Sequence, residues 1–104
     1  MAIKFDGTKF KNGSTVVGNF YNDKIYEGSY KSKVLCNISG DKIYEGAYKS
    51  KVICNVSNGK IYEGAYRSKI LITIKDAQKN VDGNMNDATI AAAWLMFAWN
   101  INAV

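Results

Sequence analysis

Lys24-Ile25-Tyr26-Glu27-Gly28 recurs as Lys42-Ile43-Tyr44-Glu45-Gly46 and as Lys60-Ile61-Tyr62-Glu63-Gly64, at an interval of 18 residues. Each copy continues through a small residue, a tyrosine and a basic segment of the type Lys-Ser-Lys or Arg-Ser-Lys. A repeat this short cannot bury a face alone, so it must stack on its neighbours and share a core with them. The repeat therefore decides the architecture.

Each repeat predicts two β-strands. The first is Lys-Ile-Tyr-Glu-Gly-(Ser/Ala)-Tyr, and the second is an aliphatic run at residues 34–38, 52–56 or 70–74. Both are rich in β-branched and aromatic residues, which strands favour. The turn signals between them are Asn22-Asp23, Gly40-Asp41 and Asn58-Gly59, and such pairs are typical of two-residue hairpins. We therefore expect an antiparallel meander.

A degenerate fourth copy precedes the three clear ones. Residues 16–20 match residues 34–38 in kind at the same interval, and Phe5-Asp6-Gly7 aligns with Tyr26-Glu27-Gly28. This alignment gives the first hairpin three extra residues around Asn12-Gly13 and predicts four hairpins, about eight strands, in all. An 18-residue interval also suits one coil of a β-solenoid, which is the alternative. The solenoid would stack Cys36 and Cys54 on adjacent coils, whereas the meander places them two strands apart as free thiols.

The register of the meander raises a question about the glutamates. With even-length turns, Ile38 pairs with Ile43, Cys36 and Cys54 flank Glu45, and Val34 and Val52 flank Ala47. This register puts the repeated glutamates on the aliphatic face, where an unpaired carboxylate is costly. A glycine inside a strand often marks a bulge. We expect a bulge at Glu-Gly that turns the glutamates to water, and a buried acidic row is the alternative.

The C-terminal part predicts a polar connector at residues 75–86 and a helix at residues 87–102, capped by Asn86 or Asp87. The helix is apolar on all sides, which indicates burial or a membrane. Its apolar stretch spans about 21 Å, too short to cross a bilayer. We expect a core helix wrapped by the curled sheet, with Trp94 and Trp99 both buried. A partner or dimer interface and a membrane anchor are the alternatives.

Composition limits the function. The 104 residues predict one domain, residues 1–104, with 47% hydrophobic and 22% charged residues. The chain has no histidine, which excludes imidazole-based zinc sites and histidine catalysis. No phosphate-binding loop, dinucleotide fingerprint or calcium loop is present. We expect a non-enzymatic protein without cofactor or metal. Residues 1–6 lack the apolar core of a signal peptide, so a cytoplasmic location is expected.

The motif Tyr26-Glu27-Gly28-Ser29-Tyr30 and its copies resemble the opening of a MORN repeat. That resemblance implies antiparallel hairpins in an elongated sheet and roles in lipid association, scaffolding and oligomerisation. MORN repeats are longer and carry further glycines that this chain lacks. Residues 24–74 also resemble small bacterial proteins of tandem Lys-Ile-Tyr-Glu-Gly hairpins with a hydrophobic C-terminal segment, which implies the fold and no particular function.

The basic residues gather in equivalent turns of successive hairpins. We call them the basic rim: Lys31, Lys33, Lys49, Lys51, Arg67 and Lys69. A meander places these turns along one edge with no interleaved acid, in a chain of net charge +5. Such a rim can attract acidic lipid headgroups or nucleic acid, although lysines at strand ends also simply keep sheets soluble. Two function classes follow. The first is a structural or protein-interaction module, which includes a homo-oligomer joined through sheet edges. The second is an anion-binding module.

Overall fold

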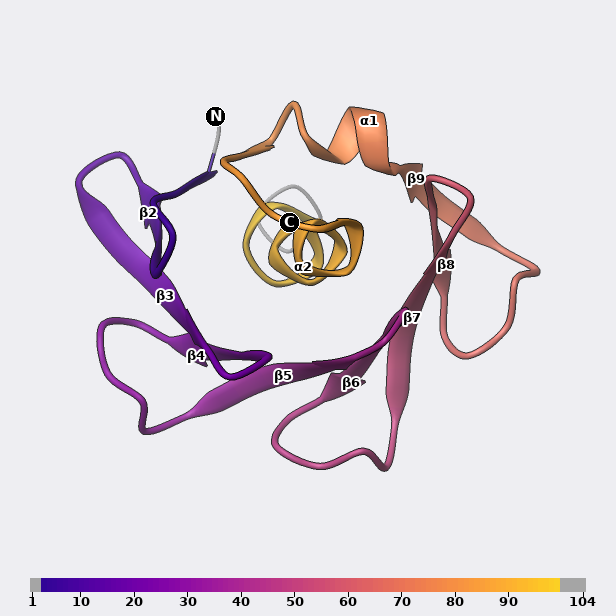
Figure 1. Ribbon diagram of the computed structural model, residues 1–104, viewed down its shortest axis with the longest axis horizontal. Helices are drawn as coiled ribbons and strands as arrows, with labels where there is room; N and C mark the ends of the chain where they lie inside the picture. The colour runs from indigo at the N-terminus through magenta and orange to yellow at the C-terminus, as the bar shows by residue number, and fades with distance from the viewer. Residues whose placement is uncertain (1–2, 100–104) are drawn as a thin grey trace.

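The computed structural model describes residues 3–99, which form one ten-stranded sheet curled around a central helix (Figure 1). The strand order is β10-β1-β2-β3-β4-β5-β6-β7-β8-β9. The strands are β1 (Ile3–Phe5), β2 (Lys9–Asn12), β3 (Thr15–Tyr21), β4 (Lys24–Glu27), β5 (Val34–Ser39), β6 (Lys42–Glu45), β7 (Val52–Ser57), β8 (Lys60–Glu63), β9 (Ile70–Thr73) and β10 (Val81–Asp82).

The predicted antiparallel meander is confirmed, with ten strands where about eight were expected. Strands β1 to β9 pair antiparallel in chain order, which excludes stacked parallel coils. The tight turns adopt the left-handed backbone that two-residue hairpins need, with φ of 54° at Asn22, 60° at Asp23 and 53° at Asn58. Cys36 lies on β5 and Cys54 on β7 with β6 between them, and both are free thiols, as expected from a meander.

The helix begins as α2 (Asp87–Ala93) and continues as a π-helical turn, η1 (Trp94–Trp99). The Asn86 side chain caps it by accepting a hydrogen bond of 2.8 Å from the Thr89 N–H. Inside the ring, the isoleucine of each Lys-Ile-Tyr-Glu motif is fully buried, at Ile25, Ile43 and Ile61. The three consecutive alanines at 91–93 are also fully buried, and their small side chains let the strands approach the helix closely. The predicted core helix is confirmed for its first half.

The segment expected as a connector is structured. It contains α1 (Ile74–Ala77), with Thr73 as its N-cap, and strand β10, which pairs in parallel with β1 through Ile3 and Val81. Ala77 and Val81 are buried, although they stand singly among polar residues in the sequence. Ile74, predicted as the end of the aliphatic strand run 70–74, instead begins α1 and is also buried. In Figure 1, α1 lies in the gap between β9 and β10, the two ends of the sheet.

One aliphatic residue per repeat is a β-bulge. Ile43 pairs with Cys54 and Tyr44 with Val52, so Ile53 is the extra residue on β7. The predicted pairing of Cys36 with Glu45 is confirmed, whereas Cys54 beside Glu45 and valines beside Ala47 are wrong. Val17, Leu35 and Leu71 are the equivalent extra residues at the same bulge in β3, β5 and β9.

The glutamates are exposed, as the bulge hypothesis expected, but the bulge lies on the following strand and not at Glu-Gly. Strand β6 ends at Glu45, and Gly46 begins the next loop with a left-handed φ of 68°. The predicted continuation of this strand through Gly-Ala-Tyr is therefore wrong. The carbonyl of the bulged Leu35 accepts the Gly46 N–H at 3.0 Å, which fixes the start of the loop.

The alignment of the first copy is also corrected. Phe10 pairs with Gly18 and Lys11 with Val16, which reproduces the bulge of the other repeats. Residues 9–13 therefore correspond to residues 24–28, and Phe5-Asp6-Gly7 does not. The offset is 15 residues on one side of the loop and 18 on the other, so the first loop is three residues shorter, not longer. Sequence comparison missed this because Phe10 and Lys11 replace the isoleucine and tyrosine of the motif.

Candidate functional site

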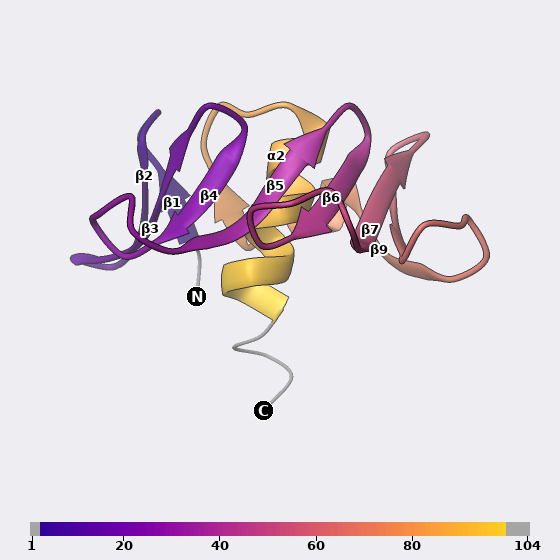
Figure 2. The same ribbon diagram turned by 90° about the horizontal axis from the view of Figure 1, so that it is seen from below.

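Three long loops project from the ring like petals (Figures 1 and 2). We call residues 28–33, 46–51 and 64–69 the petal loops. Each is held against the outer face of the sheet by a buried asparagine: Asn37 Nδ2 donates to the carbonyls of Gly46 at 2.8 Å and Tyr48 at 3.0 Å. Asn19 and Asn55 make the same pair of bonds to their own petal loops. These three petal anchors fix the positions of the loops.

The sequence contained a signal for the petal anchors that went unused. An asparagine recurs at 19, 37 and 55, inside runs that are otherwise aliphatic. The equivalent positions are Lys4 on β1, which would face the short first loop, and Thr73 on β9, which caps α1 instead. A buried amide therefore occurs wherever a long petal loop needs two carbonyls satisfied.

All six residues of the basic rim are exposed and lie in the petal loops. The expectation of a rim without interleaved acid is wrong. Each second lysine faces the glutamate that ends the preceding strand: Lys33 and Glu27 lie 4.0 Å apart, Lys51 and Glu45 3.9 Å, and Lys69 and Glu63 3.5 Å. The bulge causes this, because it shifts the pairing of β6 with β7 so that Glu45 lies beside Lys51, whose carbonyl accepts the Glu45 N–H at 2.9 Å. Three paired glutamates halve the net charge of the six basic residues.

The first basic residue of each petal loop has a different neighbour each time. Lys31 Nζ lies 4.9 Å from the centre of the Tyr21 ring, and Arg67 Nη2 lies 3.4 Å from a carboxylate oxygen of Asp41. Lys49 has no carboxylate within ion-pair distance among residues 3–99. The tyrosine before each of them is 79% exposed, at positions 30, 48 and 66. The petal tips are therefore solvated, with exposed rings beside cations.

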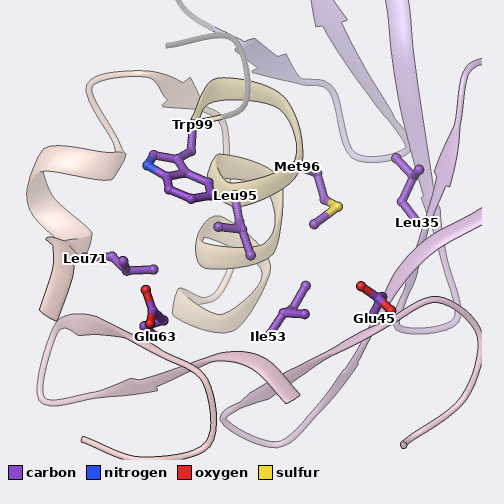
Figure 3. A pocket seen from close by; sticks show the side chains of 8 residues that line it. All are labelled: Leu35, Glu45, Ile53, Glu63, Leu71, Leu95, Met96 and Trp99. Atoms are coloured by element: carbon purple, nitrogen blue, oxygen red, sulfur yellow. The ribbon is translucent and has the colours of Figure 1, made fainter. Parts of the chain in front are cut away.

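The end of the ring next to the petal loops holds an apolar pocket of about 390 Å³ (Figure 3). We call this pocket and its lining the mouth. Three bulged residues line it from the sheet, three residues line it from η1, and two glutamates stand at its edge: Leu35, Ile53, Leu71, Leu95, Met96, Trp99, Glu45 and Glu63. The bulge therefore supplies one extra aliphatic side chain per repeat to the surroundings of the helix end.

Trp99 is 41% exposed, whereas Trp94 is 4% exposed. The prediction that both tryptophans are buried is therefore wrong for Trp99. The helix extends beyond the edge of the sheet on the side where the chain leaves the ring (Figure 2), so its last turn lacks strands around it. Residues 100–102 of the predicted helix lie outside the described residues.

The sequence did not predict the mouth, because its lining combines bulged residues with the end of a helix that extends past the strands.

Among residues 3–99 there is no group of three or more His, Cys, Asp or Glu that could hold a metal ion. In the same part of the chain, no helix has the length and apolar character that crossing a bilayer requires.

The comparisons with known proteins agree with this architecture. A family model described as "6-fold beta flower protein" matches residues 2–92. No curated protein and no solved structure matches the chain. The family model covers the whole sheet and the start of the central helix, in agreement with the predicted class of small repeat-hairpin proteins. The chain therefore belongs to the family of 6-fold beta flower proteins.

Proposed function

We propose that the protein is a cytoplasmic, non-enzymatic interaction module that binds a protein partner through the mouth. The observation that carries this proposal is the exposure of Trp99 beside an apolar pocket. Trp99 is the last residue of η1, and most of the other described residues of the helix are buried. Exposed tryptophans beside pockets are typical binding hot spots, and concave apolar surfaces are the usual places for ligands.

The chemistry of the mouth supports binding over catalysis. Its ionisable side chains are Glu45 and Glu63, each facing a lysine of a petal loop. The two cysteines are buried, and burial raises the pKa of each thiol to about 12, so neither is a nucleophile near neutral pH. Two unpaired cysteines also support a reducing compartment.

Site-specific photocrosslinking in cells tests the proposal. A photoreactive benzophenone amino acid, itself aromatic, replaces Trp99 in one variant and Tyr48 in a matched control on a petal tip. We expect a discrete crosslinked product from position 99 and none from position 48. Equal labelling from both positions, or none from position 99, would contradict the proposal.

Anion binding by the basic rim is the alternative, supported by the exposure of all six basic side chains and of the petal tyrosines. The likeness of Tyr-Glu-Gly to MORN repeats adds lipid association as an implied role. Within residues 3–99, Lys31 and Lys49 are the rim residues without a carboxylate at ion-pair distance. A lysine near an acidic membrane contributes about 1 kcal/mol, so these two charges contribute about 2 kcal/mol, which gives only weak binding.

Sedimentation with acidic and neutral liposomes, at low and high salt, tests this alternative, with a single-stranded oligonucleotide as a second probe. Anion binding requires pelleting with acidic liposomes, or oligonucleotide binding, that fades as salt rises. It also requires that replacing Lys49 and Lys51 with glutamate weakens the binding. Equal behaviour of wild type and variant at low salt would leave the rim a solubility device.

A further inference from the structure

We propose that the partner at the mouth is a second copy of this chain, packed mouth to mouth about a two-fold axis. This inference rests on the proposed function, because it names the partner of the same surface. It differs from joining through sheet edges, since the edge strands β9 and β10 face each other across α1 (Figure 1).

The shape of the mouth suits a two-fold contact with a second copy. A two-fold interface must be self-complementary, so that one surface carries both a protruding group and the cavity that receives it. The mouth meets this condition: the last turn of the helix protrudes from the ring, and the pocket lies directly beside it (Figures 2 and 3). Rotation about a two-fold axis brings Trp99 of each copy to the pocket of the other.

The charges at the edge of the mouth also suit a second copy. Two copies of a chain with net charge +5 repel each other wherever a basic surface faces its own copy. At the edge of the mouth, Glu45 faces Lys51 and Glu63 faces Lys69, so this part of the surface carries both signs and no net charge. The two-fold can then place Lys51 of one copy opposite Glu45 of the other, which adds complementary contacts around the apolar centre.

The apolar centre is of the kind that association buries. Ile53 and Leu71 are half-buried, and Trp99 is the most exposed of the tryptophan and leucine side chains of the mouth. A second copy removes these side chains from water without adding an unpaired charge. A strongly acidic or basic partner would instead leave two of the four charges at the edge without a counterpart.

Sedimentation velocity over protein concentrations from about 1 μM to about 1 mM tests the inference. We expect reversible dimerisation of wild type, and self-association at least about tenfold weaker for Trp99→Ser. Tyr48→Ser, on an exposed petal tip, is the matched control and should dimerise like wild type. The full chain is used throughout, and circular dichroism confirms that each variant is folded.

Charge reversal gives a sharper test. One variant carries Glu45→Lys and Glu63→Lys, and the other carries Lys51→Glu and Lys69→Glu. Each alone has a mouth edge of one sign and should self-associate less than wild type, whereas an equimolar mixture should form heterodimers. Dimerisation of either variant at wild-type strength, or failure of the mixture to associate, would overturn the inference.

The outcomes separate this inference from the proposed function. A chain that stays monomeric at every concentration, yet still crosslinks from position 99 to another protein in cells, overturns the second copy and leaves the interaction module standing. If the chain forms no dimer and gives no crosslink from position 99, both the second copy and the proposed interaction module are rejected. A monomer whose Trp99 becomes accessible to acrylamide only after removal of residues 100–104, measured in a Trp94→Phe background, overturns the inference in favour of the chain's own end as the occupant.

Discussion

The two halves of the central helix are both mainly apolar in sequence but differ in their surroundings. In α2, Ile90 and the alanines at 91–93 lie inside the curled sheet, next to strands β5, β6 and β7, and are buried. In η1, the chain passes the ends of the strands, and Trp99 reaches solvent beside a pocket. An all-round apolar helix can therefore be a core element at one end and a partly exposed apolar surface at the other.

The two tryptophans mark the two ends of η1, Trp94 next to α2 and Trp99 at the open end, and they give the largest expected contrast. Trp94→Ala should lower the free energy of unfolding by about 3–5 kcal/mol, because it empties a buried site. Trp99→Ala should cost about 1 kcal/mol or less, as for a substitution at a partly exposed position. Urea denaturation measures both, and equal losses would show that the two ends of η1 are packed alike.

Gly18 tests how η1 is held despite its open side. A methyl group at Gly18 would collide with the Phe97 ring and would lie 2.8 Å from the Tyr26 carbonyl oxygen. Gly18→Ala should therefore cost about 1–3 kcal/mol, as overpacking of a core usually does. Adding Phe97→Leu should recover part of that loss, since it removes one of the two collisions. No recovery would mean that Phe97 does not fix the helix at this position.

The petal anchors lie outside both halves and should have a smaller, local effect. Asn37→Ala removes two hydrogen bonds and should cost about 1–2 kcal/mol. Asn37→Asp keeps the shape but places a buried carboxyl group against two carbonyl oxygens, so it should cost at least as much. Hydrogen exchange should rise in residues 46–51 and stay unchanged in α2. Faster exchange throughout the helix would instead couple the petal loop to the core.

Thiol reactivity should separate the two halves with almost no change in stability. Cys36 and Cys54 are buried on β5 and β7, two strands that contact α2, and burial raises the pKa of each thiol to about 12. Both should resist alkylation at pH 8, whereas a cysteine introduced by Trp99→Cys should react readily. Because the folded pKa lies above the ordinary value of 9.0, their contribution to stability is complete below pH 9 and declines between about 9 and 12. Rapid alkylation of the native thiols would show that the ring opens.

The sequence predicted the meander, the tight turns and the core helix because these depend on local signals. Asn58-Gly59 determines its own backbone, and the isoleucine at 25, 43 and 61 repeats the inward position in every unit. The alignment of the first copy failed because Phe10 and Lys11 stand where the motif has isoleucine and tyrosine. The strand pairing shows that they are the counterparts of these two residues.

The candidate site was harder to predict, because it depends on register and on length. The bulge at Ile53 sets which side chains face the mouth and brings Glu45 beside Lys51, and neither follows from the alternation of residues. The exposure of Trp99 depends on where the strands end relative to the helix, a tertiary relation that helix periodicity does not contain. The positions of the basic rim were identified from sequence, whereas the carboxylates that face it were not.

The buried asparagine behind each petal loop separates the ring from the loop tip. Asn37 binds the carbonyls of Gly46 and Tyr48, and the Lys51 carbonyl accepts the Glu45 N–H, so Lys49 and Ser50 form the part of the loop between these fixed points. The first loop is already three residues shorter on an unchanged bulge. The tips should therefore accept insertions and foreign peptides, since lengthening a surface loop costs little. The ring would then serve as a scaffold on which several short sequences are displayed side by side at fixed spacing.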